Sequence, residues 1–244
     1  MSRRTIESGP AAGVPSEARV RAIFSRIAGR YDLFNRLSSL GIDRLWRRAL
    51  VRAADLDGTK RVLDIASGTG DVAFTIARLG KPHSILASDL VPEMLAVAER
   101  KYAASDIAIP IEFQVIDAQD IPLEDESFDV VTVAFGVRNM PDRARAYREA
   151  HRVLRPGGRY IILEFSTPPW SVWRVLYHAY LRIMIPLLGG ILTGKRADFV
   201  YLNDSIRGFP GQDELAADLR EAGFSSVTYQ NLSGGIAALH LAIR

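Results

Sequence analysis

The sequence predicts an α/β fold: a seven-stranded, mostly parallel sheet with an antiparallel last strand and helices on both faces. Short apolar runs alternate with segments of helical periodicity between residues 61 and 164, which is typical of parallel strands joined by helices. The first apolar run ends in a Gly-rich turn that begins a helix. Near the C-terminus, two apolar runs are separated by a short link, which indicates an antiparallel pair.

The composition is that of a globular α/β domain. The chain has 244 residues, 48% of them hydrophobic and 24% charged, which is enough for a full core with additions. It has no cysteine, which excludes disulfides, thiolate metal sites and a cysteine nucleophile. Its four histidines are scattered, so we expect no metal. The net charge of +3 is too mild for a nucleic-acid-binding surface, and we expect no nucleic acid as a partner.

We divide the chain into a disordered tail, residues 1–15, and a single domain, residues 16–244. The tail is polar, and it lacks the apolar segment of a secretory signal, so we expect a cytoplasmic protein. The domain begins with a helical cap, residues 16–55. In this cap we expect a first short helix and then a single second helix, with apolar residues from Leu33 to Leu50. The cap is expected to cover the mouth of a ligand site.

The remaining elements follow from periodicity and from turn residues. Strands are expected at residues 61–66, 84–89, 111–116, 128–134, 158–164, 226–232 and 238–243. Helices are expected near residues 71–80, 92–104, 142–153, 198–207 and 212–222. Pro92 suits the first turn of its helix, where a missing N–H costs nothing. The stretch from Arg155 to Gly158 is expected to form a turn that precedes the fifth strand.

The Gly-rich turn after the first strand predicts a site for a nucleotide-like cofactor. Gly68 and Gly70 allow a sharp turn and a close approach of ligand to backbone. Asp89 ends the next strand, at the spacing expected of an acid that binds a ribose. The turn alone would also suit a dinucleotide, but Asp64 lies where a carboxylate would repel a pyrophosphate. A cationic cofactor without phosphate, such as S-adenosylmethionine, fits better.

Two further strands bring polar residues to the same edge of the sheet. Asp117 falls at the end of the third strand, and the fourth strand leads to Arg138. Because parallel strands end at one edge, these residues are expected to share one crevice. A helix cap is the alternative role of a single acid at a strand end. For Arg138, the alternative is a structural ion pair with Asp142 or Asp129.

Residues 168–208 form an apolar insertion in the α/β pattern. Its hydrophobic run approaches the length of a membrane span, but Arg174, His178 and Arg182 interrupt the run at intervals of four residues. Three interpretations stay open: a helical lid over an apolar substrate pocket, a helix at a membrane surface, and plain core packing.

Motifs along the chain resemble the quinone-biosynthesis C-methyltransferases of the UbiE/MenG family. They lie at residues 31–35 and 39–46 (YDLFN, SLGIDRLW), 134–139 (AFGVRN), 152–158 (RVLRPGG), 163–166 (LEFS), and near 201–206 and 238–240. Two residues depart from the family pattern: Asp43 stands where His is usual, and Phe34 where Met is usual.

The resemblance implies a Rossmann-like class I fold and methyl transfer from S-adenosylmethionine to a ring carbon of a polyprenylated quinol. The expected acceptor is demethylmenaquinol, with the benzoquinol step of ubiquinone biosynthesis as a second one. The implied cofactor-binding residues are Asp64, Gly68, Thr69, Gly70, Asp89, Leu90, Met94, Asp117, Ala118 and Ala134. The implied catalytic residues are Arg138, Asn139 and Tyr31.

Some alternatives stay open after the resemblance. A methyltransferase for another hydrophobic small molecule or a lipid would share the cofactor residues. Peripheral contact with the inner face of a membrane and assembly into a homo-oligomer also stay open.

Overall fold

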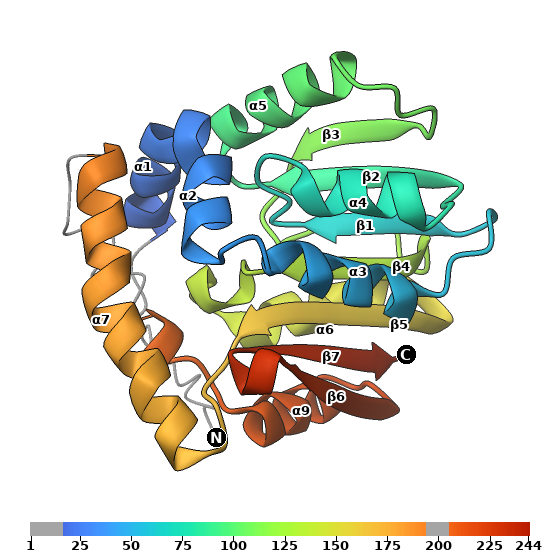
Figure 1. The fold of residues 1–244 in the computed structure, drawn as a ribbon. Helices are drawn as coiled ribbons and strands as arrows, with labels where there is room; N and C mark the ends of the chain where they lie inside the picture. The colour runs from blue at the N-terminus through green and yellow to red at the C-terminus, as the bar shows by residue number, and fades with distance from the viewer. Residues whose placement is uncertain (1–16, 194–204) are drawn as a thin grey trace, which may run out of the picture.

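The computed structural model describes residues 17–193 and 205–244, and its centre is a seven-stranded sheet (Figure 1). The strand order is β3-β2-β1-β4-β5-β7-β6. The strands are β1 (Arg61–Ile65), β2 (Ser84–Asp89), β3 (Ile111–Val115), β4 (Phe128–Ala134), β5 (Leu154–Phe165), β6 (Ser226–Leu232) and β7 (Ala237–Ile243). The first five are parallel, and β7 is antiparallel to both neighbours. The predicted fold class is confirmed.

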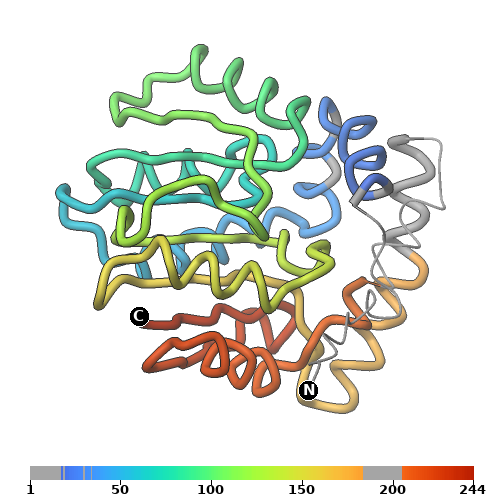
Figure 2. Tube along the Cα trace, turned by 180° about the vertical axis from the view of Figure 1, so that it is seen from behind, coloured from blue at the N-terminus to red at the C-terminus, as the bar shows by residue number. Residues whose placement is uncertain are grey.

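The two faces of the sheet carry separate apolar layers, because successive side chains of a strand point to opposite faces. Val62 and Val130 face α3 (Asp43–Ala54) and α4 (Asp71–Leu79), whereas Leu63 and Val131 face α6 (Arg143–Val153) and α9 (Gln212–Glu221). The helices α6 and α9, which cover the second face, lie in front of the sheet in Figure 2. The helix α5 (Pro92–Ala103) contributes Ala98 to the first layer.

The fifth strand begins earlier than predicted. It starts at Leu154, so the expected turn from Arg155 to Gly158 lies inside the strand. The register between β4 and β5 shifts here: Phe128 pairs with Leu154, whereas Val130 pairs with Arg159. The Pro-Gly stretch is therefore a bulge in a continuous strand rather than a separate turn.

The predicted single helix from Leu33 to Leu50 is wrong. Two helices occupy this region, α2 (Tyr31–Ser38) and α3, after α1 (Glu17–Ile27) and a short 3-10 helix, η1 (Ala28–Arg30). The break is a turn in which Leu40 and Gly41 have φ values of 51° and 76°, which a right-handed helix does not allow. Because of this break, α3 packs on the sheet through Trp46 and Leu50, while Leu33 stays 49% exposed.

The apolar insertion contains one long helix, α7 (Ser171–Thr193). It stands with α1 and α2 at the edge toward which the parallel strands point (Figure 1). The Tyr180 hydroxyl donates a hydrogen bond to the Ser38 carbonyl at 2.6 Å, which joins α7 to α2. Among the described residues, no helix is long and apolar enough to cross a membrane. The expected tail and most of the expected helix at 198–207 lie outside the described residues.

The turn between α2 and α3 yields a stability prediction. Gly41→Ala should lower the free energy of unfolding by about 1 kcal/mol, because alanine resists the positive φ although no atom lies within 4 Å of its Cβ. Gly29→Ala is the matched control, since its Cβ also meets open space but its φ is not positive. Urea unfolding measures both; equal effects of the two variants would contradict this explanation of the break.

Candidate active site

A cleft lies at the carboxyl edge of the sheet, beneath α1 and α2. Its empty volume is about 740 Å³ with the open mouth included. Nine of the residues predicted from the sequence line it: Tyr31, Gly68, Asp89, Leu90, Met94, Asp117, Ala118, Ala134 and Asn139. The edge therefore brings the ends of β1, β2 and β4 and the residues after β3 together, as the topology of a parallel sheet requires.

The turn between β1 and α4 shapes the floor of this cleft. Gly68 has a φ of 58° and lies in the cleft wall, where an added Cβ would face the side chains of Met94 and Tyr31 at 3.4 and 3.9 Å. Gly70 has a φ of 84° at the start of α4, where a Cβ would lie 2.7 Å from the ring of Phe74. Gly70 thus permits the turn without lining the cleft.

Asp89 fixes the position of this turn through both carboxylate oxygens. Its Oδ2 accepts a hydrogen bond from the Gly68 N–H at 2.8 Å, and its Oδ1 accepts one from the Val91 N–H at 2.9 Å. Burial raises the pKa of Asp89, and the backbone N–H groups act against that rise. The carboxylate lines the cleft, so it offers its remaining lone pairs to hydroxyl donors of a ligand.

Asp117 marks the other end of the cleft. Its Oδ1 accepts hydrogen bonds from the Gln119 backbone N–H at 2.9 Å and from the Gln119 Nε2 at 3.1 Å. Ile116, Ala118 and Met140 are buried around it and line the same cleft. This end combines apolar walls with a carboxylate and a side-chain amide, a combination that suits a flat heteroaromatic ring with polar edges.

Two predicted residues lie beneath the cleft rather than in its wall. Asp64 is fully buried, and its Oδ1 accepts a hydrogen bond from the Thr132 hydroxyl at 2.5 Å. Burial raises the pKa of Asp64 to about 7, and its Oδ2 has no hydrogen-bond partner in the described part of the chain. Thr69 is 2% exposed, and its hydroxyl donates to Asp32.

Arg138 forms a buried ion pair, but with neither of the acids considered from the sequence. Its Nη1 lies 2.6 Å from Oε1 of Glu164 on β5, and their side chains are 3% and 2% exposed. Asp142 instead caps α6, and Asp129 pairs with Arg155 at 2.8 Å. Glu164 was missed, although a lone acid in an otherwise apolar central strand was a usable signal, since a buried carboxylate needs a partner.

The surroundings of this ion pair connect it to the cleft. The Arg138 guanidinium lies over the Phe165 ring at 5.3 Å, and its Nε has no hydrogen-bond partner among the residues described. Arg138 itself does not line the cleft, but Phe135 and Asn139 on either side of it do. Burial raises the pKa of Tyr31, while the nearby charge of Arg138 acts to lower it. The Arg138–Glu164 pair therefore lies just behind the cleft wall, to which Tyr31 contributes.

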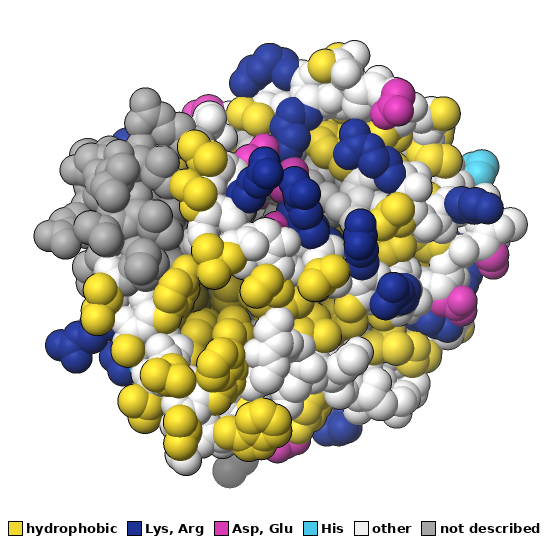
Figure 3. Space-filling view, in the orientation of Figure 1, with side chains coloured by type: hydrophobic (Ala, Val, Ile, Leu, Met, Phe, Trp, Pro, Cys, Tyr) yellow, Lys and Arg dark blue, Asp and Glu magenta, His cyan; other side chains and the backbone are white. Residues whose placement is uncertain are grey.

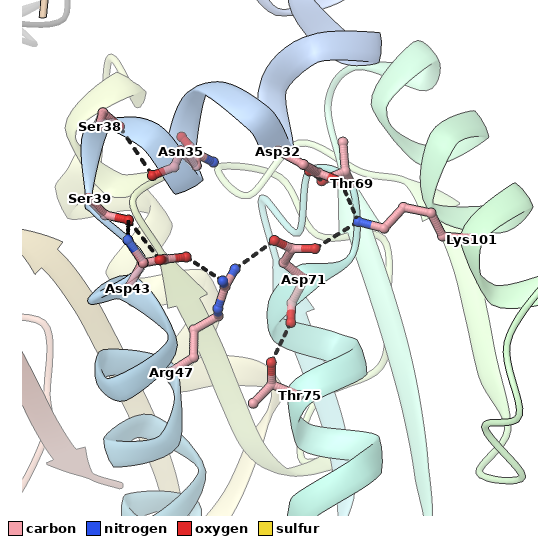
Figure 4. A network of polar contacts seen from close by, with 11 residues as sticks. Asp32, Asn35, Ser38, Ser39, Asp43, Arg47, Thr69, Asp71, Thr75 and Lys101 are labelled. Carbon is pink, nitrogen blue, oxygen red and sulfur yellow. Dashed lines mark hydrogen bonds and ion pairs between the residues drawn. The ribbon is translucent and has the colours of Figure 1, made fainter.

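A network of charged side chains links the helical cap to the turn between β1 and α4 (Figure 4). Asp32 on α2 accepts hydrogen bonds from the Thr69 hydroxyl and from Lys101 Nζ, the latter at 2.8 Å. Lys101 on α5 also lies 2.7 Å from Asp71, and Arg47 on α3 contacts Asp71 at 2.7 Å. Burial raises the pKa of Asp71, but Arg47 and Lys101 outweigh it and hold that pKa below its usual value.

The same network explains the departure from the family pattern at Asp43. This carboxylate is 6% exposed, accepts a hydrogen bond from the Ser39 hydroxyl at 2.7 Å, and pairs with Arg47. Asp43 thus holds the turn that separates α2 from α3 and orients Arg47 toward Asp71 (Figure 4). None of these pairs was predicted. The contacts of Asp71 join separate helices that only the folded chain brings together, whereas Asp43 and Arg47 are four residues apart on α3, a spacing that the sequence already contains.

Other residues of the cleft were also missed. Val20 and Phe24 reach it from α1, and Phe135, Gly136 and Pro141 from the segment after β4. Gly136 was quoted in a family motif, and an added Cβ there would lie 2.6 Å from the Ala66 side chain. The apolar residues of α1 carry no signal beyond their helical spacing, which a core helix would share.

Comparisons with known proteins agree with this geometry. The model of the ubiE/COQ5 methyltransferase family matches residues 13–244. The chain is 43% identical to the ubiquinone/menaquinone biosynthesis C-methyltransferase UbiE of Geotalea daltonii over 91% of this chain and 94% of the relative. It is 40% identical to the UbiE of Rickettsia bellii over 93% of both.

Solved structures share the fold at lower identity. The [4+2]-cyclase SpnF superposes with a TM-score of 0.71 at 17% identity, covering 97% of this chain and 98% of that one. A phosphoethanolamine N-methyltransferase of Haemonchus contortus, in complex with phosphomonomethylethanolamine and S-adenosylhomocysteine, superposes with a TM-score of 0.60 at 16% identity, over 81% and 52% of the two chains. The chain belongs to the ubiE/COQ5 methyltransferase family, and it is an S-adenosylmethionine-dependent methyltransferase of class I fold.

Proposed function

We propose that this enzyme methylates a ring carbon of a polyprenylated quinol, with demethylmenaquinol as the main acceptor and the benzoquinol of ubiquinone biosynthesis as a second one. The observation that carries the proposal is the Arg138–Glu164 pair, a buried cation beside the cofactor cleft. The names of the relatives support quinol chemistry and include both ring types.

The residues of the cleft fit S-adenosylmethionine. We assign the ribose hydroxyls to Asp89, because a carboxylate can accept from both of them. The adenine is assigned to the end of the cleft with Asp117 and Ala118, beside Leu90 and Met94. The methionine part is assigned to Gly68, the one residue of the turn at residues 68–70 that lines the cleft, with Ala134 opposite and with Asp64 beneath, whose unpaired Oδ2 suits an ammonium group.

The acceptor is assigned to the region between the cleft and α7. Tyr31 on α2 and Tyr177 on α7 both lie close enough to Arg138 for its charge to act on their pKa values, although burial raises both. The Tyr177 hydroxyl is buried and has no hydrogen-bond partner within the described ranges. These two rings and Asn139 would orient the quinol ring, and α7 would cover it.

S-adenosylmethionine supplies an electrophilic methyl group, so the difficulty lies in the weak nucleophilicity of a ring carbon. Transfer of the proton from the adjacent hydroxyl to a water molecule pushes electron density onto that carbon, whose electron pair then forms the bond to the methyl group. The electron pair of the broken bond stays with the donor, and the ring carbon finally loses its own proton to restore the aromatic ring. The enzyme must also align the reacting atoms.

Arg138 would act in this reaction as a fixed cation. A guanidinium does not lose its proton in a protein, so it cannot be the base, but it stabilises the phenolate that develops on the quinol oxygen. Its Nε is buried behind the cleft wall and has no hydrogen-bond partner among the described residues, so this atom would be available to that oxygen. Glu164 is a positioning residue, because it holds the guanidinium in place from the far side.

The identity of the acceptor is tested by measuring the transfer of label from a methyl-labelled donor to each quinol with purified enzyme. We expect label on the ring of demethylmenaquinol, and less on the benzoquinol. The oxidised quinones are the matched controls and should gain no label, since they lack the hydroxyl proton whose loss activates the ring. Transfer to neither quinol would overturn the proposed function, and a preference for the benzoquinol would reverse the assignment of the main acceptor.

Asp89→Asn tests the cofactor assignment. The amide cannot accept from two hydroxyls and two backbone N–H groups together, so the Kd for S-adenosylhomocysteine should rise about 10- to 100-fold. Isothermal titration calorimetry gives the value, and Glu112→Gln, an exposed acid on the neighbouring β3, is the control. An unchanged Kd in Asp89→Asn would remove Asp89 from the cofactor site.

Arg138→Ala tests the role of the cation. It should lower kcat about 100-fold or more while changing the Kd of the donor little, because the lost interaction forms with the acceptor. Alanine leaves Glu164 unpaired and buried, so Arg138→Ala/Glu164→Gln is needed as a second variant that keeps the fold and stays inactive. Arg145→Ala, an exposed arginine paired with Asp120, is the control. Full activity in the double variant would contradict the assignment.

A further inference from the structure

An exposed apolar surface beside the cleft is explained neither by the core nor by cofactor binding. We call it the apolar rim. It consists of Leu37, Leu40, Ile42 and Leu45 around the turn between α2 and α3, and Trp170, Val172, Val175 and Leu176 at the start of α7. Leu40 is 80% exposed and Val172 74%. Hydrophobic side chains gather over this part of the molecule around a hollow (Figure 3).

The two halves of the apolar rim are held together by hydrogen bonds. Trp46 on α3 donates to the Ser233 hydroxyl at 2.9 Å, and Trp173 on α7 donates to the Ser233 carbonyl at 3.4 Å. Tyr180 and Ser38 join α7 to α2 in the same way. The two halves of the apolar rim are therefore fixed relative to each other, and exposed apolar residues gathered in this way mark interaction sites.

The charges beside the apolar rim are positive. Arg44, Arg48 and Arg52 are exposed at intervals of four residues along α3, whose single acid, Asp43, is buried. On α7, Arg174 is exposed, and the sequence of that helix contains no acid. A symmetric contact between two copies through this face would bring two sets of exposed arginines together. The nearby acids, Asp32 and Asp71, are already paired with Lys101 and Arg47, so a second copy is a poor occupant.

We propose that the apolar rim docks on a bilayer that contains anionic phospholipid. Its leucines, valines and tryptophan enter the headgroup region, and the arginines of α3 and Arg174 contact lipid phosphates. This inference rests on the proposed function, because a polyprenyl tail keeps the acceptor in the membrane. The helices that carry the rim also carry Tyr31 and Tyr177, so docking here presents the acceptor region to the membrane.

Vesicle flotation tests the docking with the full chain. Vesicles of phosphatidylcholine with phosphatidylglycerol should bind the protein, and vesicles of phosphatidylcholine alone should bind much less. Arg44→Gln/Arg48→Gln should weaken binding to the anionic vesicles about 30-fold, and added salt should weaken binding of the wild type. Equal binding to both vesicle types, or to neither, would overturn the proposal.

Leu40→Glu/Val175→Glu tests the apolar contribution. Both residues are mostly exposed, so the melting temperature and the affinity for S-adenosylhomocysteine should not change, while vesicle binding should be lost. Leu79→Glu is the matched control, since Leu79 is 55% exposed at the end of α4 and outside the apolar rim. Wild-type vesicle binding by the double variant would overturn the proposal. So would a dimer of the wild-type protein that the double variant splits, since a second copy would then occupy this face.

The activity assay separates this inference from the proposed function. The Leu40→Glu/Val175→Glu variant should methylate a short-tailed soluble quinol at the wild-type rate. It should methylate a long-tailed quinol in vesicles several-fold more slowly. Failure of the wild type on every quinol, with vesicle binding intact, would reject the proposed function alone. Normal transfer to the soluble quinol, without any vesicle binding, would reject the docking alone.

Discussion

The ion pair between Arg138 and Glu164 is the interaction on which the site depends. Taking both charges out of water is costly, and their mutual attraction offsets that cost only when the geometry is good. Here the geometry is enforced from several sides: β5 supplies Glu164, the segment after β4 supplies Arg138, and Phe165 lies under the guanidinium. The result is a cation held beside the cleft by protein contacts, where the proposed reaction needs a positive charge.

The cleft itself depends on a different kind of constraint. Asp89 ties the Gly68 turn to the start of α5, so β1 and β2 present their ends as one rigid wall. The cap then closes over this wall through the charges that link Asp32, Lys101 and Asp71. Tyr31 precedes Asp32 on α2, so the network that fixes the cap also fixes the ring that faces the ion pair.

Much of this arrangement could be predicted from the sequence because it follows from topology. Strand ends of a parallel sheet must meet, and this rule placed Asp89 and Asp117 in one cleft. The same rule placed Arg138 there, but Arg138 does not line the cleft. The predictions failed where the structure depends on information that hydrophobic periodicity does not contain. The helical spacing of Leu33, Leu37 and Leu45 predicted a buried face, but the Leu40–Gly41 turn leaves these side chains exposed.

The charged partners were equally hard to predict, for a related reason. Lys101 and Arg47 are distant in sequence from Asp32 and Asp71, the acids they hold, and only tertiary packing selects them among the many bases of the chain. The isolated acid in the apolar strand β5 was the exception, since its burial demanded a cation. For Arg138, the alternative interpretation of a structural ion pair therefore holds in kind, although the partner is Glu164 rather than Asp142 or Asp129.

The most direct measurement is a crystal structure of the enzyme with S-adenosylhomocysteine and a quinol analogue. We expect a ring oxygen of the analogue within about 3.5 Å of the Arg138 guanidinium, with Tyr31 and Asn139 against the ring. A ring bound away from the ion pair, with Arg138 still enclosed by protein and no ligand oxygen near it, would contradict the account.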